Sequence, residues 1–174
     1  MIEEQLKKQE YDFISKDEKQ FVSAFSKAMQ EIGYVNDGIT PYVCLGRYKI
    51  EYYKAQNKTK KVIARFYFRD NGIVLRLYFT DIDRHREYIE KAEDFIKNPF
   101  INEKGRCKQC DKSGGGIGKK GKCSFKKTYT IDGIIYMKCA GENYYFANHD
   151  LYVIPKYIEL IETFYPVKIK NQTK

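Results

Sequence analysis

Four cysteines of this chain have the spacing of a metal site. Cys107 and Cys110 form a C-x2-C pair, Cys123 follows after twelve residues, and Cys139 follows after fifteen more. A C-x2-C turn presents two sulfurs to one ion, and four thiolates suit tetrahedral zinc. A glycine-bearing loop and a hairpin would bring the other two sulfurs around. We therefore expect a structural zinc site at these four cysteines, whose role is to fold the loop.

Other chemistry is open to the same cysteines. They could be free thiols, form a disulfide, or include a redox-active pair at Cys107 and Cys110, although this pair lacks the strand-to-helix setting of a thioredoxin site. His149 is a possible substitute ligand. A catalytic zinc needs an open position and a nearby acid or base, and the only acid in this stretch is Asp111. We therefore favour a structural metal and expect no enzyme activity.

The same stretch carries most of the excess positive charge. The chain has 32 Lys and Arg against 23 Asp and Glu. Between Lys104 and Lys127 there are nine basic residues and one acid, so this segment alone carries +8 while the rest is nearly neutral. Such a segment suits the phosphates of nucleic acid, although a biased base composition of the gene also produces a lysine-rich chain. The lysines that we expect to contact nucleic acid are Lys108, Lys112, Lys119, Lys120 and Lys122.

Two further patterns suggest chemistry but are better explained by structure. The run from Ser113 to Lys120 resembles a phosphate-binding loop, but Ser113 replaces the first glycine of that motif and Lys120 replaces its hydroxyl residue. The cluster Asp81, Asp83, His85 and Glu87 falls at the start of a predicted helix, where acids satisfy free amides and the helix dipole. We expect a flexible loop in the first case and a solvated helix start in the second.

The aromatic residues allow two interpretations. The chain has 16 Tyr and 11 Phe but no Trp, and single-strand nucleic-acid binders interleave aromatic rings with cations. The favoured alternative is that the tyrosines line a sheet with their hydroxyls at its rim. The candidates for a stacking surface are Tyr52, Tyr53, Tyr67, Tyr144, Tyr145 and Phe146.

The elements that must position these residues follow from the hydrophobic pattern. A capping box at Ser15 and Glu18 and apolar residues at helical intervals predict a helix over 16–32, which Gly33 ends. Two further helices are predicted, one over 82–97 that ends at Asn98-Pro99, and one that begins near Pro155 and ends at Pro166. Strands are expected at 42–45, 47–53, 61–69, 73–79, 127–130, 134–138 and 144–147, with turns at 70–72 and at Asp132-Gly133.

This order of elements predicts an α+β fold, with an antiparallel meander and helices packed on one face of the sheet. We expect a single domain over residues 1–174, in which 100–126 is a metal-stapled basic loop insert and 167–174 is a loose tail. Cys44 lies in the apolar run of a predicted strand, and we expect it to be a small core residue. No apolar run is long enough to span a membrane, and the amino terminus lacks the pattern of a secretory signal, so we expect a cytoplasmic protein.

The order of Arg47 to Ala55, the hairpin from Val62 to Phe79, the helix after it and the last strands and helix resembles small bacterial proteins with a YjbR-like fold. The hairpin that begins at Tyr129 and ends in Lys138-Cys139 is also similar to short cysteine-containing clostridial proteins. The resemblance implies an α+β sheet, a cytoplasmic setting and DNA or small-ligand binding, but no catalytic residues. The insert from Cys107 to Cys123 departs from the YjbR-like pattern.

Three functions follow from these observations. The first is a non-enzymatic binding module whose basic loop, stapled by zinc, contacts nucleic acid mainly through charge. The second is a small-ligand or protein-interaction domain in which the loop acts as a lid. The third is a thiol redox protein that uses Cys107 and Cys110.

Overall fold

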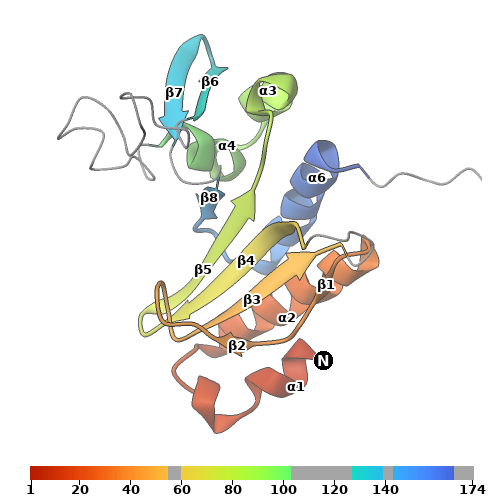
Figure 1. Cartoon of the computed structure of the whole chain (residues 1–174), viewed down its shortest axis with the longest axis vertical. Helices are drawn as coiled ribbons and strands as arrows, with labels where there is room; N and C mark the ends of the chain where they lie inside the picture. Colours follow the sequence, from red (N-terminus) through yellow and green to blue (C-terminus); the bar gives the residue numbers. More distant parts are fainter. Residues whose placement is uncertain (55–59, 103–126, 139–142, 167–174) are drawn as a thin grey trace, which may run out of the picture. The chain divides into compact units, whose positions relative to one another are not determined.

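The computed structural model describes residues 1–54, 60–102, 127–138 and 143–166 (Figure 1). The chain divides into two compact units, one formed by Met1–Val74 with Asn148–Lys174 and the other by Leu75–Ala147. We call them unit 1 and unit 2. A compact unit need not fold on its own, so the expected single domain stays a prediction.

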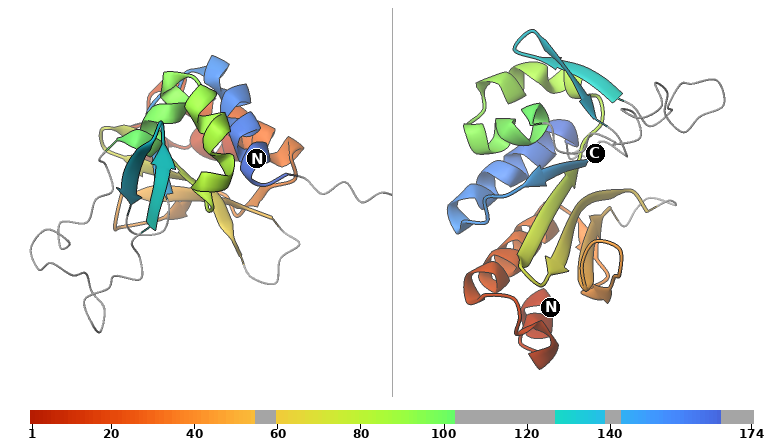
Figure 2. Two further views of the ribbon diagram at one scale, coloured as in Figure 1. Left: turned by 90° about the horizontal axis from the view of Figure 1, so that it is seen from above. Right: turned by 90° about the vertical axis from the view of Figure 1, so that its left-hand side faces the viewer.

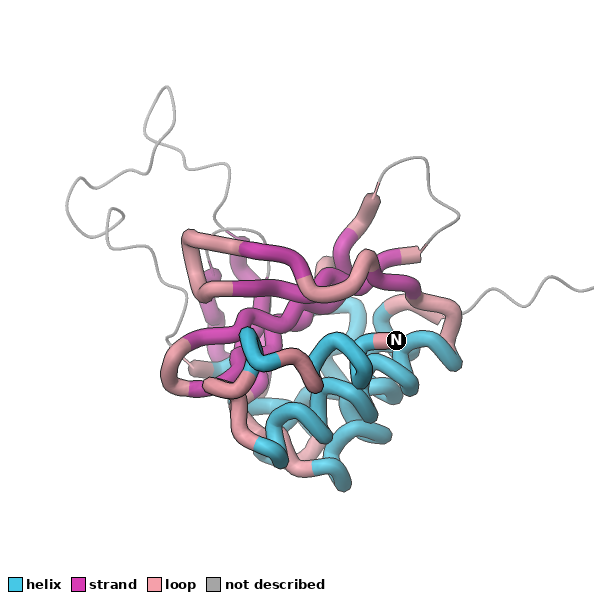
Figure 3. Tube along the Cα trace, turned by 90° about the horizontal axis from the view of Figure 1, so that it is seen from below, coloured by secondary structure: helices cyan, strands magenta, loops and turns pink. Residues whose placement is uncertain are grey.

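Unit 1 combines helices with an antiparallel sheet, which confirms the α+β class. Strands β1 and β2 both pair with β3, and β3 pairs with β4, all in the antiparallel sense. Figure 3 shows the helices of unit 1 gathered on one side of its strands. The helical elements are α1 (Ile2–Leu6), η1 (Gln9–Tyr11), α2 (Lys16–Glu31), η3 (Leu151–Val153) and α6 (Ile154–Phe164). The strands are β1 (Val35–Asn36), β2 (Thr40–Pro41), β3 (Tyr48–Tyr53), β4 (Val62–Arg69) and the start of β5 (Gly72–Tyr78).

Helix α2 begins and ends as its sequence predicts. The Ser15 hydroxyl accepts a hydrogen bond from the Glu18 N–H, and the Glu18 carboxylate accepts one from the Ser15 N–H, so the capping box is present. Gly33 follows the helix with φ +82°, a conformation that favours glycine. The buried face of α2 packs its phenylalanine rings on β3 and β4, with Phe25 edge-to-face against both Tyr52 and Phe66.

The start of α2 is tied to the hairpin of β4 and β5. Glu18 Oε1 accepts a hydrogen bond of 2.9 Å from the Ile73 N–H. Gly72 has φ +116°, and a Cβ atom there would lie 2.5 Å from Glu18 Oε1. The predicted turn at 70–72 is confirmed, and its glycine leaves room for the Glu18 carboxylate.

Unit 2 continues from β5 and contains a second, separate sheet (Figure 2). The end of β5, from Leu75 to Tyr78, pairs antiparallel with β8, whereas β6 and β7 form a two-stranded hairpin. The hairpin turn has Asp132 at φ 51° and Gly133 at φ 74°, as the sequence predicts. The elements are η2 (Ile82–His85), α3 (Arg86–Lys91), α4 (Asp94–Ile101), β6 (Lys127–Ile131), β7 (Ile134–Lys138) and β8 (Asn143–Phe146).

The predicted helix over 82–97 is wrong in two respects. It is divided into η2, α3 and α4, because Ala92 and Glu93 adopt extended backbone angles. The Asn98-Pro99 pair does not end it, since α4 continues through Pro99 to Ile101. Pro99 removes one backbone hydrogen bond, but Pro99 and Phe100 are both buried in unit 2, and this burial offsets the loss. The first residues of the predicted insert therefore belong to a core helix.

The predicted strand over 42–45 is also wrong, because these residues form a bend. Tyr42 N–H donates to the Arg47 carbonyl, which closes a loop between β2 and β3. A Cβ atom at Gly46 would lie 2.5 Å from the Phe68 carbonyl oxygen, so the loop approaches β4 closely at this glycine. Cys44 is exposed within the bend and is not a core residue.

Candidate functional site

The residues that the sequence predicts for the zinc and nucleic-acid sites lie outside the described residues. These are Cys107, Cys110, Cys123, Cys139, Lys108, Lys112, Lys119, Lys120 and Lys122. The run from Ser113 to Lys120 and the tail over 167–174 lie outside them as well. What the structure describes is the part of unit 2 that borders the segments 103–126 and 139–142.

Three residues that border the segments 103–126 and 139–142 lie together in unit 2, and we call this place the root. Asn102 precedes the segment 103–126, Lys127 follows it, and Lys138 precedes Cys139. Lys127 and Lys138 are partners in the register of the β6–β7 hairpin. The Lys138 ammonium donates hydrogen bonds to both the backbone carbonyl and the side-chain Oδ1 of Asn102, the latter at 3.0 Å. The end of α4 and the open end of the hairpin are therefore joined.

Lys138 is an unusual residue for this position. Its side chain comes from a strand end, yet only 3% of the residue is exposed. Burial lowers the pKa of Lys138 from 10.5 to about 8. A buried amine is costly unless it is hydrogen-bonded, and the two Asn102 oxygens supply these bonds. No local sequence pattern indicates this pair, because the residues lie 36 positions apart.

Buried aromatic side chains pack next to the root. The Tyr129 hydroxyl of β6 donates a hydrogen bond to the Phe100 carbonyl near the end of α4. Phe100 packs on Tyr144 of β8 with ring centroids 4.5 Å apart, and Tyr144 also contacts Tyr129 edge-to-face. All three rings are almost fully buried. The root is thus a packed junction of α4, β6 and β8.

The acidic cluster near residue 85 has structural roles. Asp83 Oδ1 accepts a hydrogen bond of 2.8 Å from the Thr130 N–H of β6. Asp81 precedes η2 in a left-handed conformation, and burial lowers the pKa of His85. Within the described residues, no group of three or more His, Cys, Asp or Glu side chains could hold a metal ion. His149, the possible substitute ligand, packs its ring 5.2 Å from that of Phe21 in unit 1.

Most of the aromatic residues considered for a stacking surface are instead packed in the fold or paired with charged side chains. Tyr52 is fully buried against α2, with its hydroxyl 2.6 Å from Ser26 Oγ. Tyr53 donates its hydroxyl hydrogen to Asp37. Tyr144 and Phe146 are buried, and the Arg76 guanidinium lies over the Tyr145 ring at 4.1 Å. These rings are occupied by packing or by cations, so they do not form an open stacking surface.

On the face of β3 and β4 opposite α2, the cations are similarly paired. Glu51 lies at the centre of this face and forms ion pairs with Lys49 at 3.0 Å, with Arg65, and with Lys60 at 3.7 Å. Burial alone would raise the pKa of Glu51, but the Lys49 hydrogen bond and the charges of Arg65 and Lys60 outweigh it and hold that pKa below its ordinary value. These three cations share one carboxylate, so the face keeps an excess of positive charge. Their side chains are already engaged in ion pairs, which makes this face a weaker candidate for binding phosphate than free cations would be.

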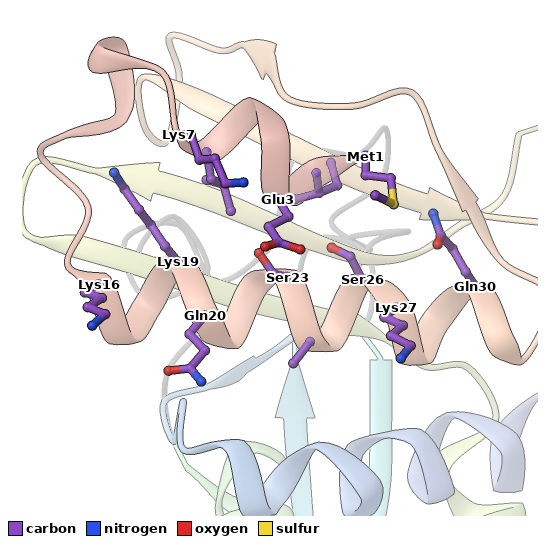
Figure 4. A pocket seen from close by; sticks show the side chains of 13 residues that line it. Met1, Glu3, Lys7, Lys16, Lys19, Gln20, Ser23, Ser26, Lys27 and Gln30 are labelled. Atoms are coloured by element: carbon purple, nitrogen blue, oxygen red, sulfur yellow. The ribbon is translucent and has the colours of Figure 1, made fainter.

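A groove of about 950 Å³ lies between α1 and α2 in unit 1 (Figure 4). Lys7 and Lys19 lie at one end and Lys27 at the other, with Glu3 and Ser23 between them. No helix before residue 16 is predicted from the sequence, so a groove between α1 and α2 is not predicted either. The sequence signal for one wall of the groove is the row of polar residues at 16, 20, 23 and 27, which recur at helical intervals along α2.

Two of the four lysines that line the groove have carboxylate partners. Lys7 forms an ion pair with Glu4 at 2.7 Å, and Lys19 forms one with Asp12 at 3.5 Å. The acidic Glu3 also lines the groove. Four lysines against one glutamate give the lining an excess of positive charge, and Ile2 and Leu6 add apolar surface, so the groove suits a small anionic ligand.

Comparison with known proteins adds no further information about this site. No family model matches the chain, and neither a search of curated proteins nor a search of solved structures finds a match. The resemblance to YjbR-like and clostridial proteins therefore stays a prediction. Among the described residues, no helix has both the length and the apolar character needed to cross a membrane.

Proposed function

We propose that this protein is a non-enzymatic binding module, in which a structural zinc site formed by four cysteines fixes a basic segment that contacts the phosphates of nucleic acid. The observation that carries the proposal is the root. It joins Asn102, Lys127 and Lys138, three of the four described residues that border the cysteine-bearing segments. Both cysteine-bearing segments are therefore connected in sequence to residues of the root.

Chain lengths support this proposal. Cys107 lies five residues after Asn102, Cys123 lies four residues before Lys127, and Cys139 follows Lys138 directly. An extended chain spans at most roughly 3.5 Å per residue, so these sulfurs are tethered within roughly 20 Å of the root. The C-x2-C spacing ties Cys110 to Cys107. Convergence of four thiolates on one zinc ion therefore requires no rearrangement of the root.

Electrostatics supports nucleic acid as the partner. Nine of the ten charged residues between Lys104 and Lys127 are basic, whereas the cations on the sheet face of unit 1 are paired with Glu51 and with tyrosine rings. Unpaired cations bind phosphates by releasing counterions, which makes affinity fall steeply with salt. The basic segment is therefore the part of the chain where such binding is expected.

Zinc content is tested by native mass spectrometry of the full-length protein. The proposal expects one zinc ion per chain, lost when Cys107 and Cys110 are replaced by serine and retained in a Cys44→Ser control. A chain that carries no zinc and contains an oxidised pair at Cys107 and Cys110 would favour the thiol redox function instead.

Nucleic-acid binding is tested with a triple charge reversal at Lys119, Lys120 and Lys122. Binding to a mixed-sequence duplex and to a single strand is measured over a range of salt concentrations. The proposal expects affinity that decreases steeply with salt and is lost in the triple variant. The matched control reverses Lys8, Lys16 and Lys27 of unit 1, which changes the net charge equally. Equal losses in both variants would indicate non-specific attraction and contradict the assignment to this segment.

The groove between α1 and α2 favours a second candidate, a small-ligand or protein-interaction domain. It differs from the first because its binding would survive charge reversal at Lys119, Lys120 and Lys122. A Ser23→Trp substitution, which fills the middle of the groove, would abolish small-ligand binding while leaving salt-sensitive binding to nucleic acid unchanged.

A further inference from the structure

The turn of the β6–β7 hairpin determines which opposite residues exchange backbone hydrogen bonds. We call this alternation of bonded and non-bonded pairs the hydrogen-bond phase. Ile131 and Ile134 are opposite each other, and the two residues between them have left-handed backbones, as in a type I′ turn. The pair that flanks such a turn exchanges hydrogen bonds, and bonded and non-bonded pairs then alternate. The Tyr129–Tyr136 pair is bonded, whereas Ile135 and Met137 belong to non-bonded pairs. The N–H and C=O groups of Ile135 and Met137 therefore point away from β6, toward the outer edge of β7.

The outer edge of β6 is protected by acidic side chains. The Thr130 N–H, which points away from β7, donates to Asp83 Oδ1 at 2.8 Å. The Asp132 N–H of the turn donates to Glu90 Oε1, also at 2.8 Å. The Thr130 bond supports the hydrogen-bond phase independently, because this N–H is not used within the hairpin. Both bonds also satisfy donors that would otherwise allow another strand to add at this edge.

The outer edge of β7 has no comparable protection in the part of the chain that the structure describes. Its sheet contains only β6 and β7 there, and neither Ile135 nor Met137 has an outward hydrogen-bond partner. Charged side chains, proline and bulges are the usual means of blocking an edge. Over Ile134–Lys138 there is no proline or bulge, and the one charge, on Lys138, is buried.

The side chains along this edge are apolar and exposed. Ile135 is 74% exposed and Met137 is 36% exposed, whereas Tyr129 and Ile131 on the opposite face of the hairpin are buried. Ile134, which lies beside the turn on the face of Ile131, is 56% exposed. Ile135 and Met137 are two residues apart, so their side chains lie on the same face of the hairpin. The edge thus combines unpaired backbone groups with an apolar strip.

We propose that β7 pairs antiparallel with β7 of a second copy of this chain, about a two-fold axis at Tyr136. Ile135 and Met137 are spaced symmetrically about Tyr136, so Ile135 of each copy lies opposite Met137 of the other. Both pairs can exchange two hydrogen bonds across the edges. The result is a four-stranded sheet in the order β6, β7, β7, β6, with the exposed apolar side chains in cross-strand contact.

A second copy is the occupant because the edge is complementary to itself. A two-fold interface requires that the same strip fit its own inverted copy. The outward groups of β7 meet this requirement through their symmetric spacing, and the side chains meet it because both are apolar. The inference is independent of the proposed zinc and nucleic-acid function, which needs only one chain.

Sedimentation equilibrium and amide hydrogen exchange of the full-length protein test this inference. Both are carried out with a reducing agent, which prevents disulfide dimers through the exposed Cys44. We expect self-association in which the Ile135 and Met137 amides become protected as protein concentration rises. The Tyr136 amide, which bonds within the hairpin, should be protected at every concentration. A chain that stays monomeric up to millimolar concentration, or a dimer in which the Ile135 and Met137 amides exchange freely, would overturn the inference.

Substitutions give a second measurement. Ile135→Lys places a charge at each end of the joint strip and should weaken self-association by about tenfold. Val43→Lys is the matched control, because Val43 is 96% exposed in unit 1 and far along the sequence from β7. Equal association of the two variants would contradict pairing through β7. Association of wild-type protein only in the presence of a different polypeptide would also contradict it, since the edge would then serve another partner.

Discussion

Lys138 on β7 and Asn102 after α4 are joined by two hydrogen bonds, although 36 residues separate them. This contact closes the root from which the cysteine-bearing segments leave. Because Lys138 precedes Cys139 directly, its position limits where that sulfur can lie. The link between Lys138 and Asn102 therefore connects the packing of unit 2 with the proposed zinc site.

Loss of this link should weaken zinc binding without changing its stoichiometry. Lys138→Met keeps the apolar stem but removes the hydrogen bonds to Asn102, and we expect about a tenfold decrease in zinc affinity, comparable to the loss of a supporting contact around a metal ligand. Competition with a chromophoric chelator measures it. Lys127→Met, at the exposed register partner of Lys138, is the control and should leave affinity unchanged. Unchanged zinc affinity in both variants would show that the contact between Lys138 and Asn102 does not support zinc binding.

Acid should destabilise unit 1 through Glu18. Burial alone would raise the pKa of Glu18, but hydrogen bonds from the Ile73 N–H and from Ser15, together with the charge of His149, lower it below 4.5. A carboxyl group with a lowered pKa in the folded state stabilises the protein above its unfolded pKa, and this contribution is lost as pH falls through the folded value. Glu18→Gln should therefore lower the free energy of unfolding by about 1 kcal/mol at neutral pH and by less in acid.

Urea unfolding at neutral pH and at a pH below 4.5 measures this difference. Asp17→Asn is the control, because Asp17 is exposed in the same helical turn and is not part of the capping box. A Glu18→Gln variant whose destabilisation is the same at both pH values would show that the carboxylate charge contributes nothing.

The buried hydroxyl pair of Ser26 and Tyr52 should show strong coupling. Ser26 Oγ lies 2.6 Å from the Tyr52 hydroxyl and donates to the Val22 carbonyl at 2.7 Å. Tyr52 is fully buried, and burial raises the pKa of its hydroxyl. Ser26→Ala leaves that hydroxyl without a partner and should cost about 1–3 kcal/mol. Tyr52→Phe in the Ser26→Ala background should cost much less than in the wild type, which a double-mutant cycle of unfolding free energies measures.

Local signals were sufficient to predict much of this fold. The capping box at Ser15 and Glu18, and the turn at Asp132 and Gly133, are determined by neighbouring residues, and the structure contains both. Helix α6 was also predicted near its observed bounds, since Pro155 lies in its first turn. Patterns of this kind need no knowledge of distant contacts.

The incorrect predictions depended on tertiary contacts. The apolar run around Cys44 has strand propensity, but the close approach of Gly46 to the Phe68 carbonyl and the Tyr42–Arg47 hydrogen bond make it a bend. Pro99 usually ends a helix, but its burial in unit 2 keeps it within α4. The bond between Lys138 and Asn102 joins distant residues, so no local pattern could reveal it. The cysteine site itself lies outside the described residues, and its prediction rests on spacing alone.

The reactivity of the five cysteines should distinguish Cys44 from the others. Cys44 is exposed in the bend before β3, so its thiol should react immediately with a chromogenic thiol reagent in the native protein. Thiolates bound to zinc react slowly, because the metal occupies their nucleophilic electron pair. The zinc-loaded protein should therefore show one fast thiol, and a chelator should release the remaining four. Cys44→Ser should remove the fast phase and leave the chelator-dependent phase intact, whereas several fast thiols in the zinc-loaded protein would contradict coordination by all four cysteines.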